Sequence, residues 1–214
     1  MFTGIINQTC SVAAIEKSLD FMRFAVKIPA TLCKDLQTGA SVAVDGCCQT
    51  VTQIDTIDTD NSHTVWFDAM QETLRRTTLG SLSVGHSVNI ERAAVFGQEV
   101  GGHELSGHVD DTIVVENIEQ TSTNHIITLS LPKTVSSYVF NKGYLGIHGA
   151  SLTVSDLDRD NNSFKVYLIP ETLKMTNLGQ CKKGDRLNLE IDRRTQVIVD
   201  TVRATLAEMK MTDV

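Results

Sequence analysis

The sequence predicts an all-β protein: two homologous six-stranded Greek-key barrels followed by a C-terminal α-helix. The first observation behind this prediction is a duplication. Residues 72–80 (ETLRRTTLG) return 99 residues later as ETLKMTNLG, and residues 46–51 (GCCQTV) return 103 residues later as GASLTV. A period of about 100 residues is the size of a small domain and is too long for a solenoid unit. We therefore expect two similar domains.

The second observation is that short strand-like runs fill both copies, with no long helix between them. The runs are rich in Val, Ile and Thr and are separated by turn-forming residues. In the first copy we expect strands at 5–16, 21–28, 41–54 and 63–68, a helical turn at 30–36, and turns at 17–20, 45–46 and 58–62. In the second copy we expect strands at 109–118, 126–131, 143–157 and 163–169, a helical turn at 133–140, and a turn at 158–162. Six short strands in each half suit closed barrels, which leave no exposed sheet edge.

The tail follows a different pattern. Residues 195–210 contain no Gly or Pro, and Val199, Val202, Leu206 and Met209 are spaced by three, four and three residues. This spacing is typical of the apolar seam of a helix. Two interpretations remain open: the helix packs on its own barrel, or it joins several chains into an oligomer. The expected domains are therefore 1–100, 101–193, and a helix with its tail at 194–214.

Composition excludes several classes of function. The 214 residues carry a net charge of −7 and 5% aromatic residues, which argues against a nucleic-acid-binding barrel with a basic groove and stacking rings. No apolar run approaches the roughly 20 residues of a membrane span, and no signal peptide is visible. The five cysteines show no zinc spacing, so we expect free thiols in a reducing, cytoplasmic environment.

One candidate for chemistry occurs in both copies, in the segments at 46–50 and 149–153. Alternation along a strand places Cys48 and Thr50 on one face, and Ser151 and Thr153 on the corresponding face of the second copy. Each face offers a small nucleophilic or hydrogen-bonding group next to a hydroxyl. The alternative is ordinary strand propensity with a buried thiol. Recurrence of small polar groups at the same place favours a site.

A second candidate is residues 101–110 (GGHELSGHVD), at the junction of the two copies. The paired glycines suggest an unusual backbone or the close approach of a ligand. Two histidines five residues apart raise the possibility of a metal, but no compact set of partner ligands is evident, so we expect no metal. A histidine with a near-neutral pKa is instead suited to moving a proton.

Two further segments have open interpretations. Residues 67–73 and 166–172 each end a strand, and their backbone could read the amide edge of a heterocycle. The Glu-Thr-Leu sequence that closes each segment could equally cap a short helix. Residues 189–192 (LEID) precede the tail helix, and Asp192 is suited either to capping that helix or to contacting a ligand.

Together, these segments resemble the riboflavin synthase family. The resemblance covers essentially the whole chain: MFTGI at the start, GCCQTVT at 46–52, both ETL…LG segments, GGH at 101–103, SGH at 106–108, and the stretch from Asp192 into the tail. It implies two barrels related by a pseudo-twofold axis and a helix that assembles a homotrimer. It also implies the last step of riboflavin biosynthesis, in which two molecules of 6,7-dimethyl-8-ribityllumazine exchange a four-carbon unit. The products are riboflavin and 5-amino-6-ribitylaminouracil, with no cofactor and no metal.

The resemblance also implies site residues, with pockets that face each other across two chains. The residues carried over to the N-barrel pocket are Gly4, Ile5, Ile6, Cys48, Gln49, Thr50, Asp68, Ala69, Met70, Gln71, Glu72 and Thr73. Those carried over to the C-barrel pocket are Gly107, His108, Val109, Lys142, Ser151, Leu152, Thr153, Leu168, Ile169, Pro170, Glu171 and Thr172, and Asp192 is a further contact. His103 is the expected base, and Cys48 and Ser151 are the expected nucleophiles or activating groups.

The chain departs from the family pattern at a few positions. His148 stands where the family usually has Asp, Gln49 where Leu is frequent, and Asp45 where Asn is also common. We expect His148 to change the charge beside the C-barrel pocket. The alternative function is a non-catalytic, fluorescent lumazine- or flavin-binding protein. Such relatives tend to lose the Ser-Gly-His segment, which this chain keeps at residues 106–108.

Overall fold

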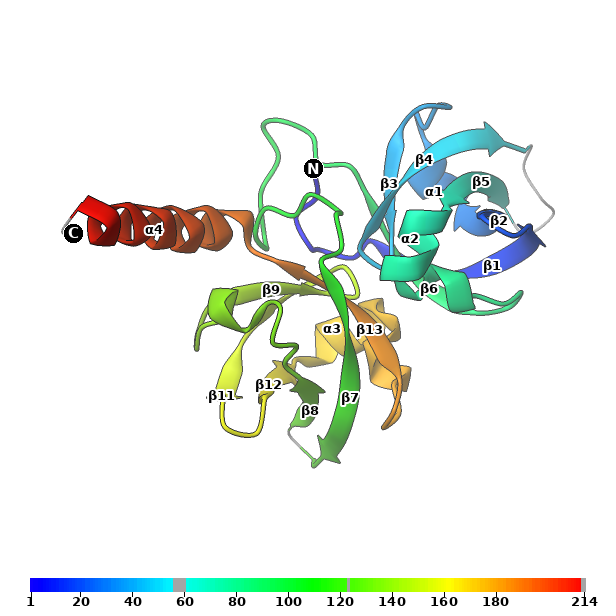
Figure 1. Ribbon diagram of the computed structural model, residues 1–214. Coiled ribbons are helices and arrows are strands. Elements are labelled where there is room, and N and C mark those ends of the chain that lie inside the picture. The colour runs from blue at the N-terminus through cyan, green and yellow to red at the C-terminus, as the bar shows by residue number, and fades with distance from the viewer. Residues whose placement is uncertain (56–60, 123, 213–214) are drawn as a thin grey trace.

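The computed structural model describes residues 1–55, 61–122 and 124–212. It contains two barrel-like sheets, one above the other, and a long C-terminal helix that projects away from both (Figure 1). The fold class expected from the sequence is confirmed. Most of the turn expected at 58–62 lies outside the described residues.

The first sheet is a closed six-stranded barrel in the order β1-β2-β5-β4-β3-β6. Its strands are β1 (Gln8–Lys17), β2 (Phe21–Pro29), β3 (Ser41–Val44), β4 (Cys47–Ile54), β5 (Ser62–Met70) and β6 (Ser87–Arg92). Short helices α1 (Ala30–Cys33) and α2 (Gln71–Arg76) and a 3₁₀ turn, Thr78–Ser81, follow β2 and β5. The side chains that point inward form one core, which includes Met22, Phe24 and Phe67.

The second sheet has seven strands in the order β10-β9-β13-β7-β8-β12-β11. They are β7 (Asp111–Gln120), β8 (His125–Ser130), β9 (Tyr144–Ile147), β10 (Ala150–Thr153), β11 (Ser155–Asp158), β12 (Ser163–Leu168) and β13 (Arg186–Ile191). Helix α3 (Pro170–Met175) and 3₁₀ turns Ser136–Tyr138 and Asn177–Gln180 complete it. The extra strand arises because the copy of β4 is divided into β10 and β11. The division lies at Val154, and Asp156, with φ 46°, falls at an irregularity within β11, whereas β4 stays continuous through a bulge between Val51 and Gln53.

The two barrels meet through reciprocal contacts that define a pseudo-twofold relation. Asn89 in β6 donates to the carbonyl of His148 at 2.9 Å, and Asn188 in β13 donates to the carbonyl of Asp45 at 2.8 Å. At the centre, a Cβ added to Gly46 would lie 2.6 Å from the backbone nitrogen of Gly149. Only glycine permits two turns to approach this closely, and both glycines have positive φ.

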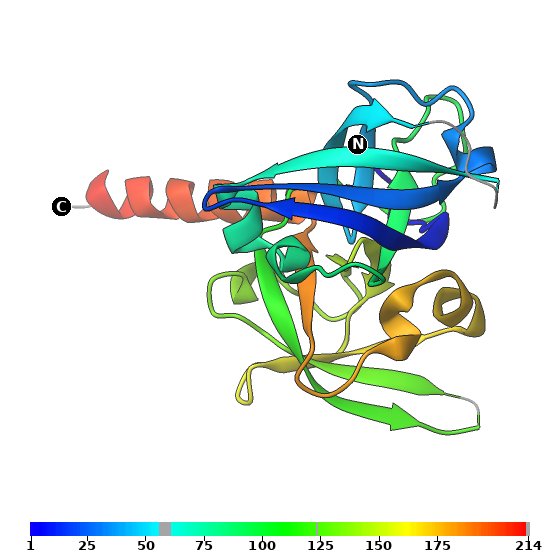
Figure 2. The ribbon, with the colours of Figure 1, turned by 90° about the vertical axis from the view of Figure 1, so that its right-hand side faces the viewer.

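Helix α4 (Arg193–Thr212) leaves the barrels after its first turns (Figures 1 and 2). Arg193 in its first turn bonds His108 and Asp110, and further along the helix Asp200 accepts the hydroxyl of Tyr138 at 2.7 Å. Val202, Leu206 and Met209 are each more than half exposed. The interpretation in which the apolar seam packs on its own barrel is therefore wrong. Within the part of the chain that the structure describes, no helix combines the length and the apolar character needed to span a membrane.

Candidate active site

The first segment of each repeat packs on the barrel of the other repeat. Ile6 lies in the core of the second barrel, and Val109 packs against the core of the first. The backbone N–H of Ser151 donates to the carbonyl of Gly4, and that of Cys48 donates to the carbonyl of Gly107, both at 2.8 Å. Phe2 and Leu105 bridge the two crossing segments.

This exchange corrects the grouping of residues expected from the resemblance. Gly4, Ile5 and Ile6 lie with Ser151 rather than with Cys48, and Gly107, His108 and Val109 lie with Cys48. The contact is tight, because a Cβ on Gly4 would lie 2.6 Å from Cβ of Ser151, and one on Gly107 would lie 2.6 Å from Cβ of Cys48. Repeat similarity shows which segments correspond but not which barrel each one covers.

We define the Ser151 site as the outer face of β10 at Ser151 and Thr153 with the covering segment 4–6. The Cys48 site is the outer face of β4 at Cys48 and Thr50 with the covering segment 107–109. In both strands the expected alternation is confirmed: Cys48 is half-buried and Thr50 is exposed, whereas Gln49 is buried. Gln49 and its counterpart Leu152 therefore point into the barrels, so only their backbone could face a ligand.

A buried carboxylate holds each covering segment. Glu91 accepts hydrogen bonds from the Thr3 N–H at 2.6 Å, the Thr3 hydroxyl at 2.8 Å and the Gly4 N–H at 3.1 Å. Glu190 accepts the corresponding three bonds from Ser106 and Gly107 at 2.7, 2.6 and 3.0 Å. Burial raises the pKa of both carboxyls, an effect that these hydrogen bonds oppose. The two sites thus share one frame.

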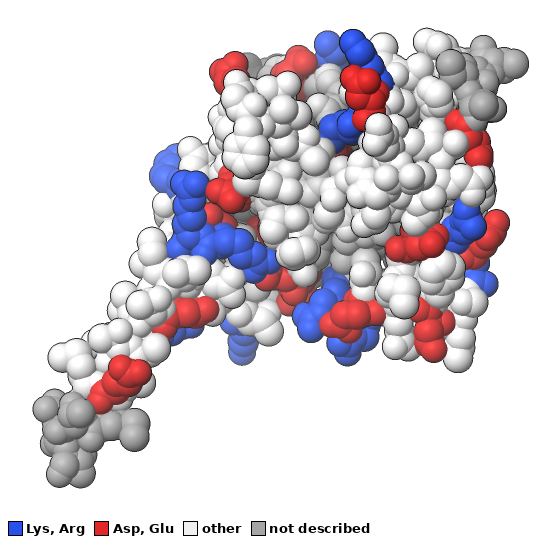
Figure 3. Space-filling view, turned by 90° about the horizontal axis from the view of Figure 1, so that it is seen from above, with Lys and Arg blue, Asp and Glu red and all other residues white. Residues whose placement is uncertain are grey.

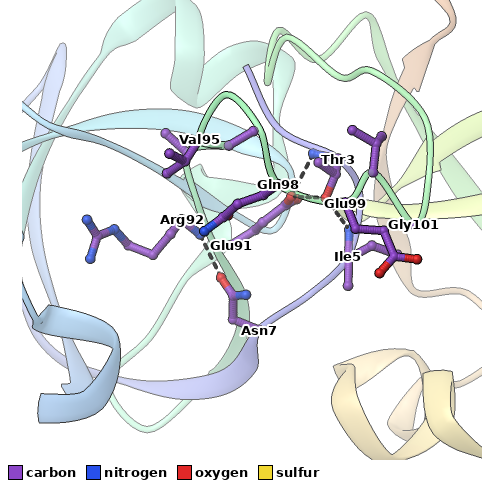
Figure 4. Close-up of a pocket in the computed structure, with 12 residues that line it drawn as sticks. Thr3, Ile5, Asn7, Glu91, Arg92, Val95, Gln98, Glu99 and Gly101 are labelled. Carbon is purple, nitrogen blue, oxygen red and sulfur yellow. Dashed lines mark hydrogen bonds between the residues drawn. The ribbon is translucent and has the colours of Figure 1, made fainter.

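The sequence reasoning did not assign a role to these two acids. The signal was present, since each copy has an asparagine followed two residues later by an acid, Asn89 with Glu91 and Asn188 with Glu190. Figure 4 shows Glu91 directed at Thr3, beside a pocket of about 450 Å³. The loop of residues 93–101 forms the other side of this pocket.

The strand-end segments border the two sites. Pairing between β4 and β5 begins at Val51 and Phe67, next to Thr50 and Asp68. In β5, Asp68 and Met70 are exposed and Ala69 is buried; in the second copy, Leu168 is buried and Ile169 is exposed. A groove of about 520 Å³ lies beside Lys142, Thr153 and Tyr167. Its volume is in the range of small-molecule sites.

The Glu-Thr-Leu segments form the short helices α2 and α3. Gln71 hydrogen-bonds Asp20, Glu72 pairs with Arg75 and Arg76, and Glu171 lies 4.0 Å from Lys174. Pro170 occupies the first turn of α3, and the carbonyls of Thr73 and Thr172 accept the hydroxyls of the threonines four residues later. Both segments are therefore helical, with the acids in the first turn. The capping role is not borne out, because the N-cap residues are Met70 and Ile169 and neither helix has a side-chain hydrogen bond at its N-cap.

His103 and Ser151 lie in direct contact. The Nδ1 atom of His103 is 2.6 Å from the hydroxyl oxygen of Ser151, and its ring stacks on Tyr144 with centroids 5.4 Å apart. Burial lowers the pKa of His103, which the charge of Asp192 partly opposes. The Nε2 atom is buried without a hydrogen-bond partner in the structure. A neutral imidazole with one nitrogen on a hydroxyl is suited to accept a proton.

The Cys48 site has different neighbours. A groove of about 800 Å³ is bordered by Cys48 and His108 from the barrels, by Asp192, and by residues from the start of α4, namely Arg193, Arg194, Val197 and Ile198. Asp192 accepts hydrogen bonds from the N–H groups of Arg194 and Thr195 and from the Thr195 hydroxyl. These bonds together lower the pKa of Asp192, although burial raises it. Asp192 therefore caps α4, as one of the two sequence interpretations expected.

His148 lies away from both sites, in contrast to the expectation. It occupies the turn between β9 and β10 with φ 51°, which directs its side chain toward the first barrel. There its Nε2 atom is 3.4 Å from Oδ1 of the buried Asp45, and its Nδ1 atom accepts the N–H of Asn188 at 3.1 Å. Histidine at this position thus belongs to the contact between the barrels.

The described residues contain no group of three His, Cys, Asp or Glu side chains placed to hold a metal ion.

A family model described as the lumazine binding domain matches the chain twice, at residues 3–93 and 106–192. Riboflavin synthase of Escherichia coli (strain K12) is 45% identical over 208 residues, 97% of this chain and 94% of that protein. The chain belongs to the riboflavin synthase family.

Other comparisons agree with this membership. Riboflavin synthase of Chlamydia pneumoniae is 40% identical over 207 residues, 97% of this chain and 98% of that protein. Among solved structures, LumP complexed with riboflavin matches with a TM-score of 0.79 and 26% identity, covering 90% of this chain and all of that one. LumP complexed with 6,7-dimethyl-8-(1'-D-ribityl) lumazine matches with a TM-score of 0.78 and 25% identity, covering 90% of this chain and 99% of that one.

Proposed function

We propose that the chain is a riboflavin synthase, which converts two molecules of 6,7-dimethyl-8-ribityllumazine into riboflavin and 5-amino-6-ribitylaminouracil. The observation that carries the proposal is the pair of sites with one frame and different side chains. A reaction between two identical heterocycles needs two similar binding sites. It also needs the two molecules to be treated differently. Among the described residues, the contact between His103 and a site hydroxyl is made at the Ser151 site.

In this proposal His103 removes a proton from the 7-methyl group of a lumazine. This group is unusually acidic because its carbanion is delocalised into the ring system. A base of modest strength is sufficient, and the lowered pKa of His103 keeps the imidazole neutral and able to accept the proton. Ser151 helps to activate the ring of the partner lumazine toward addition at C7. Cys48 and Thr50 position the other lumazine. Orientation of the two rings supplies much of the remaining rate acceleration.

The proposed substrate contacts follow the pairing that the structure shows. Segment 4–6, Lys142, residues 151–153 and residues 168–172 serve one lumazine. Segment 107–109, residues 48–50 and residues 68–73 serve the other. Asp192 lies near His103 and contributes through its charge.

We further propose that α4 assembles a homotrimer in which each pair of lumazines lies between two chains. The support is the exposed apolar face of α4, where Val197, Ile198 and Val202 are 65%, 64% and 52% exposed and Leu206 and Met209 continue the face. Light scattering on the full chain is expected to give three times the monomer mass. Leu206→Glu should lower this mass, and Ala207→Glu on the opposite helix face should leave it unchanged. Monomers in the unaltered protein would contradict the proposal.

A cytoplasmic location stays a prediction.

The decisive experiment is incubation of the purified protein with 6,7-dimethyl-8-ribityllumazine alone. The expected result is the formation of riboflavin and 5-amino-6-ribitylaminouracil in equal amounts. Chromatography with fluorescence and absorbance detection measures both products. The similarity to LumP structures with bound riboflavin and lumazine keeps a second candidate, a fluorescent binding protein. Tight binding of the lumazine without any product would favour that candidate and overturn the proposed reaction.

A further inference from the structure

The segment that covers the Cys48 site has an anchor that its counterpart lacks. The guanidinium of Arg193, the first residue of α4, donates from Nη2 to the carbonyl of His108 at 2.7 Å. Its Nη1 lies 2.8 Å from Oδ1 of Asp110 and donates to Oε1 of Gln196 at 2.9 Å. One side chain therefore connects the covering segment, the residue directly before β7 and the first turn of α4.

The corresponding positions in the first copy show that this anchor is an addition to the repeated frame. Asn7 corresponds to Asp110, and Ala94 corresponds to Arg193. The side chain of Asn7 accepts the N–H of Arg92 at 2.8 Å, as that of Asp110 accepts the N–H of Ile191 at 2.9 Å. The bond to the neighbouring strand is thus common to both copies, and the guanidinium is present only at the Cys48 site.

The environment of Arg193 makes this contact more constraining than an ordinary surface pair. The side chains of Arg193 and Asp110 are 36% and 19% exposed, and the guanidinium bonds a charged and a neutral acceptor at once. The neighbouring Arg194 makes a single pair with Glu104, with exposures of 79% and 54%. Exposed single pairs of that kind contribute little. Figure 3 shows basic side chains gathered where the projecting helix joins the barrels.

We propose that Arg193 is a positioning residue for the Cys48 site, which fixes the covering segment 107–109 to α4 and so makes ligand affinity at Cys48 depend on the helix. The covering segment lies directly on Cys48, because the Cys48 N–H donates to the Gly107 carbonyl at 2.8 Å. The same groove is bordered by Cys48, His108 and Arg193. Displacement of α4 at Arg193 would therefore move the covering segment and change the affinity for a ligand at Cys48. The role in turnover rests on the proposed function, but the role in ligand binding does not.

The test compares Arg193→Met, Arg193→Lys and Asp110→Asn with Arg203→Met as the control on the same helix, because Arg203 pairs with Asp200 at 4.0 Å and lies outside the groove at Cys48. Asp110→Asn introduces the residue found at the corresponding position of the first copy: the asparagine oxygen can still accept the Ile191 N–H, but the oxygen that bonds the Arg193 guanidinium is lost. Riboflavin affinity is measured by fluorescence quenching, and kcat and KM are measured with 6,7-dimethyl-8-ribityllumazine. Assembly is checked by light scattering. The rate of Cys48 alkylation by iodoacetamide is measured by peptide mapping, with Cys181 as the internal reference.

Arg193→Met and Asp110→Asn are expected to weaken riboflavin binding and to raise KM about tenfold, the size expected for loss of a charge-assisted hydrogen bond. They should also increase Cys48 alkylation several-fold relative to Cys181. Arg193→Lys should restore part of the affinity, and Arg203→Met should stay within twofold of the unaltered protein. If Arg193→Met alters only thermal stability, with affinity and Cys48 alkylation unchanged, the proposal is overturned. Absence of riboflavin formation by the unaltered protein would refute the proposed function. The binding and alkylation measurements would still decide whether Arg193 positions the Cys48 site.

Discussion

The Ser151 site and the Cys48 site have the same frame and different surroundings. In each, a buried glutamate holds a crossing segment from the other repeat, and a strand N–H donates to a glycine carbonyl of that segment. The Ser151 site adds His103 and Tyr144, whereas the Cys48 site adds the start of α4 with Arg193. The duplicated residues thus provide two similar places for a ligand. His103 and α4, which lie outside the duplication, and Tyr144, which lies in β9 within the second copy, make the two places unequal.

The largest effect is expected from removal of the base at the Ser151 site. His103→Asn should lower kcat for riboflavin formation by about 10²- to 10⁴-fold, the range for loss of general base catalysis. Ser151→Ala should have an intermediate effect, and Cys48→Ser should reduce kcat by less than about tenfold because serine keeps a small polar group. Steady-state kinetics with 6,7-dimethyl-8-ribityllumazine measures all three. Nearly unchanged turnover in both Ser151→Ala and Cys48→Ser would contradict the roles proposed for Ser151 in activating the partner ring and for Cys48 in positioning the substrate.

The next largest effect concerns the contact that holds the two frames together. Gly46→Ala should lower the free energy of unfolding by about 3 kcal/mol or more, since the added Cβ meets the backbone of Gly149 at 2.6 Å. Gly39→Ala is the control: φ is +87°, but nothing lies within 4 Å of the added Cβ. Backbone strain alone should cost about 1 kcal/mol there. Urea unfolding midpoints measure the difference. Equal costs at the two positions would mean that the barrels can move apart freely.

A smaller and symmetric effect is expected at the two carboxylates. Glu91→Gln and Glu190→Gln each place an amide N–H against backbone donors, so each should destabilise the fold by about 2 kcal/mol. Because the hydrogen bonds of the two acids correspond one to one, the two costs should agree within about 0.5 kcal/mol. Thermal or urea unfolding of the two single variants provides the comparison. A large inequality between them would show that the frames differ in energy despite their common geometry.

The smallest effect separates the two functions of Asp192. Asp192→Asn keeps a cap for α4, since asparagine caps as well as aspartate. It removes the charge that raises the pKa of His103, so that pKa should fall further below its ordinary value. A base is lost when pH falls through its pKa. The acid limb of kcat/KM should therefore move to lower pH, by less than about one unit.

Profiles between pH 4.5 and 8 measure this shift. Asp200→Asn is the matched control on the same helix, because Asp200 contacts Tyr138 and Arg203 rather than His103. A limb that stays in place, or moves to higher pH, would show that Asp192 does not influence the base.

Much of the architecture could be predicted from the sequence because strand alternation and duplication are periodic, local properties. The common strand face of Cys48 and Thr50, the helical turns after β5 and β12, and the tail helix all follow from such patterns, whereas the outward direction of that face is known from the structure. The same patterns mark His103 and Ser151 as candidates, but they do not show that the two side chains touch. That contact joins residues 48 positions apart in the chain.

The sequence by itself determined two repeated barrels with corresponding polar strand faces at Cys48 and Ser151. Only the tertiary structure decided that each covering segment crosses to the other barrel, and that His148 faces Asp45. The physical reason is that the two repeats offer similar surfaces, so pattern alone cannot distinguish packing within a repeat from packing between repeats. Close contact decides it, since Gly4 and Gly107 fit against Ser151 and Cys48 only because they carry no Cβ.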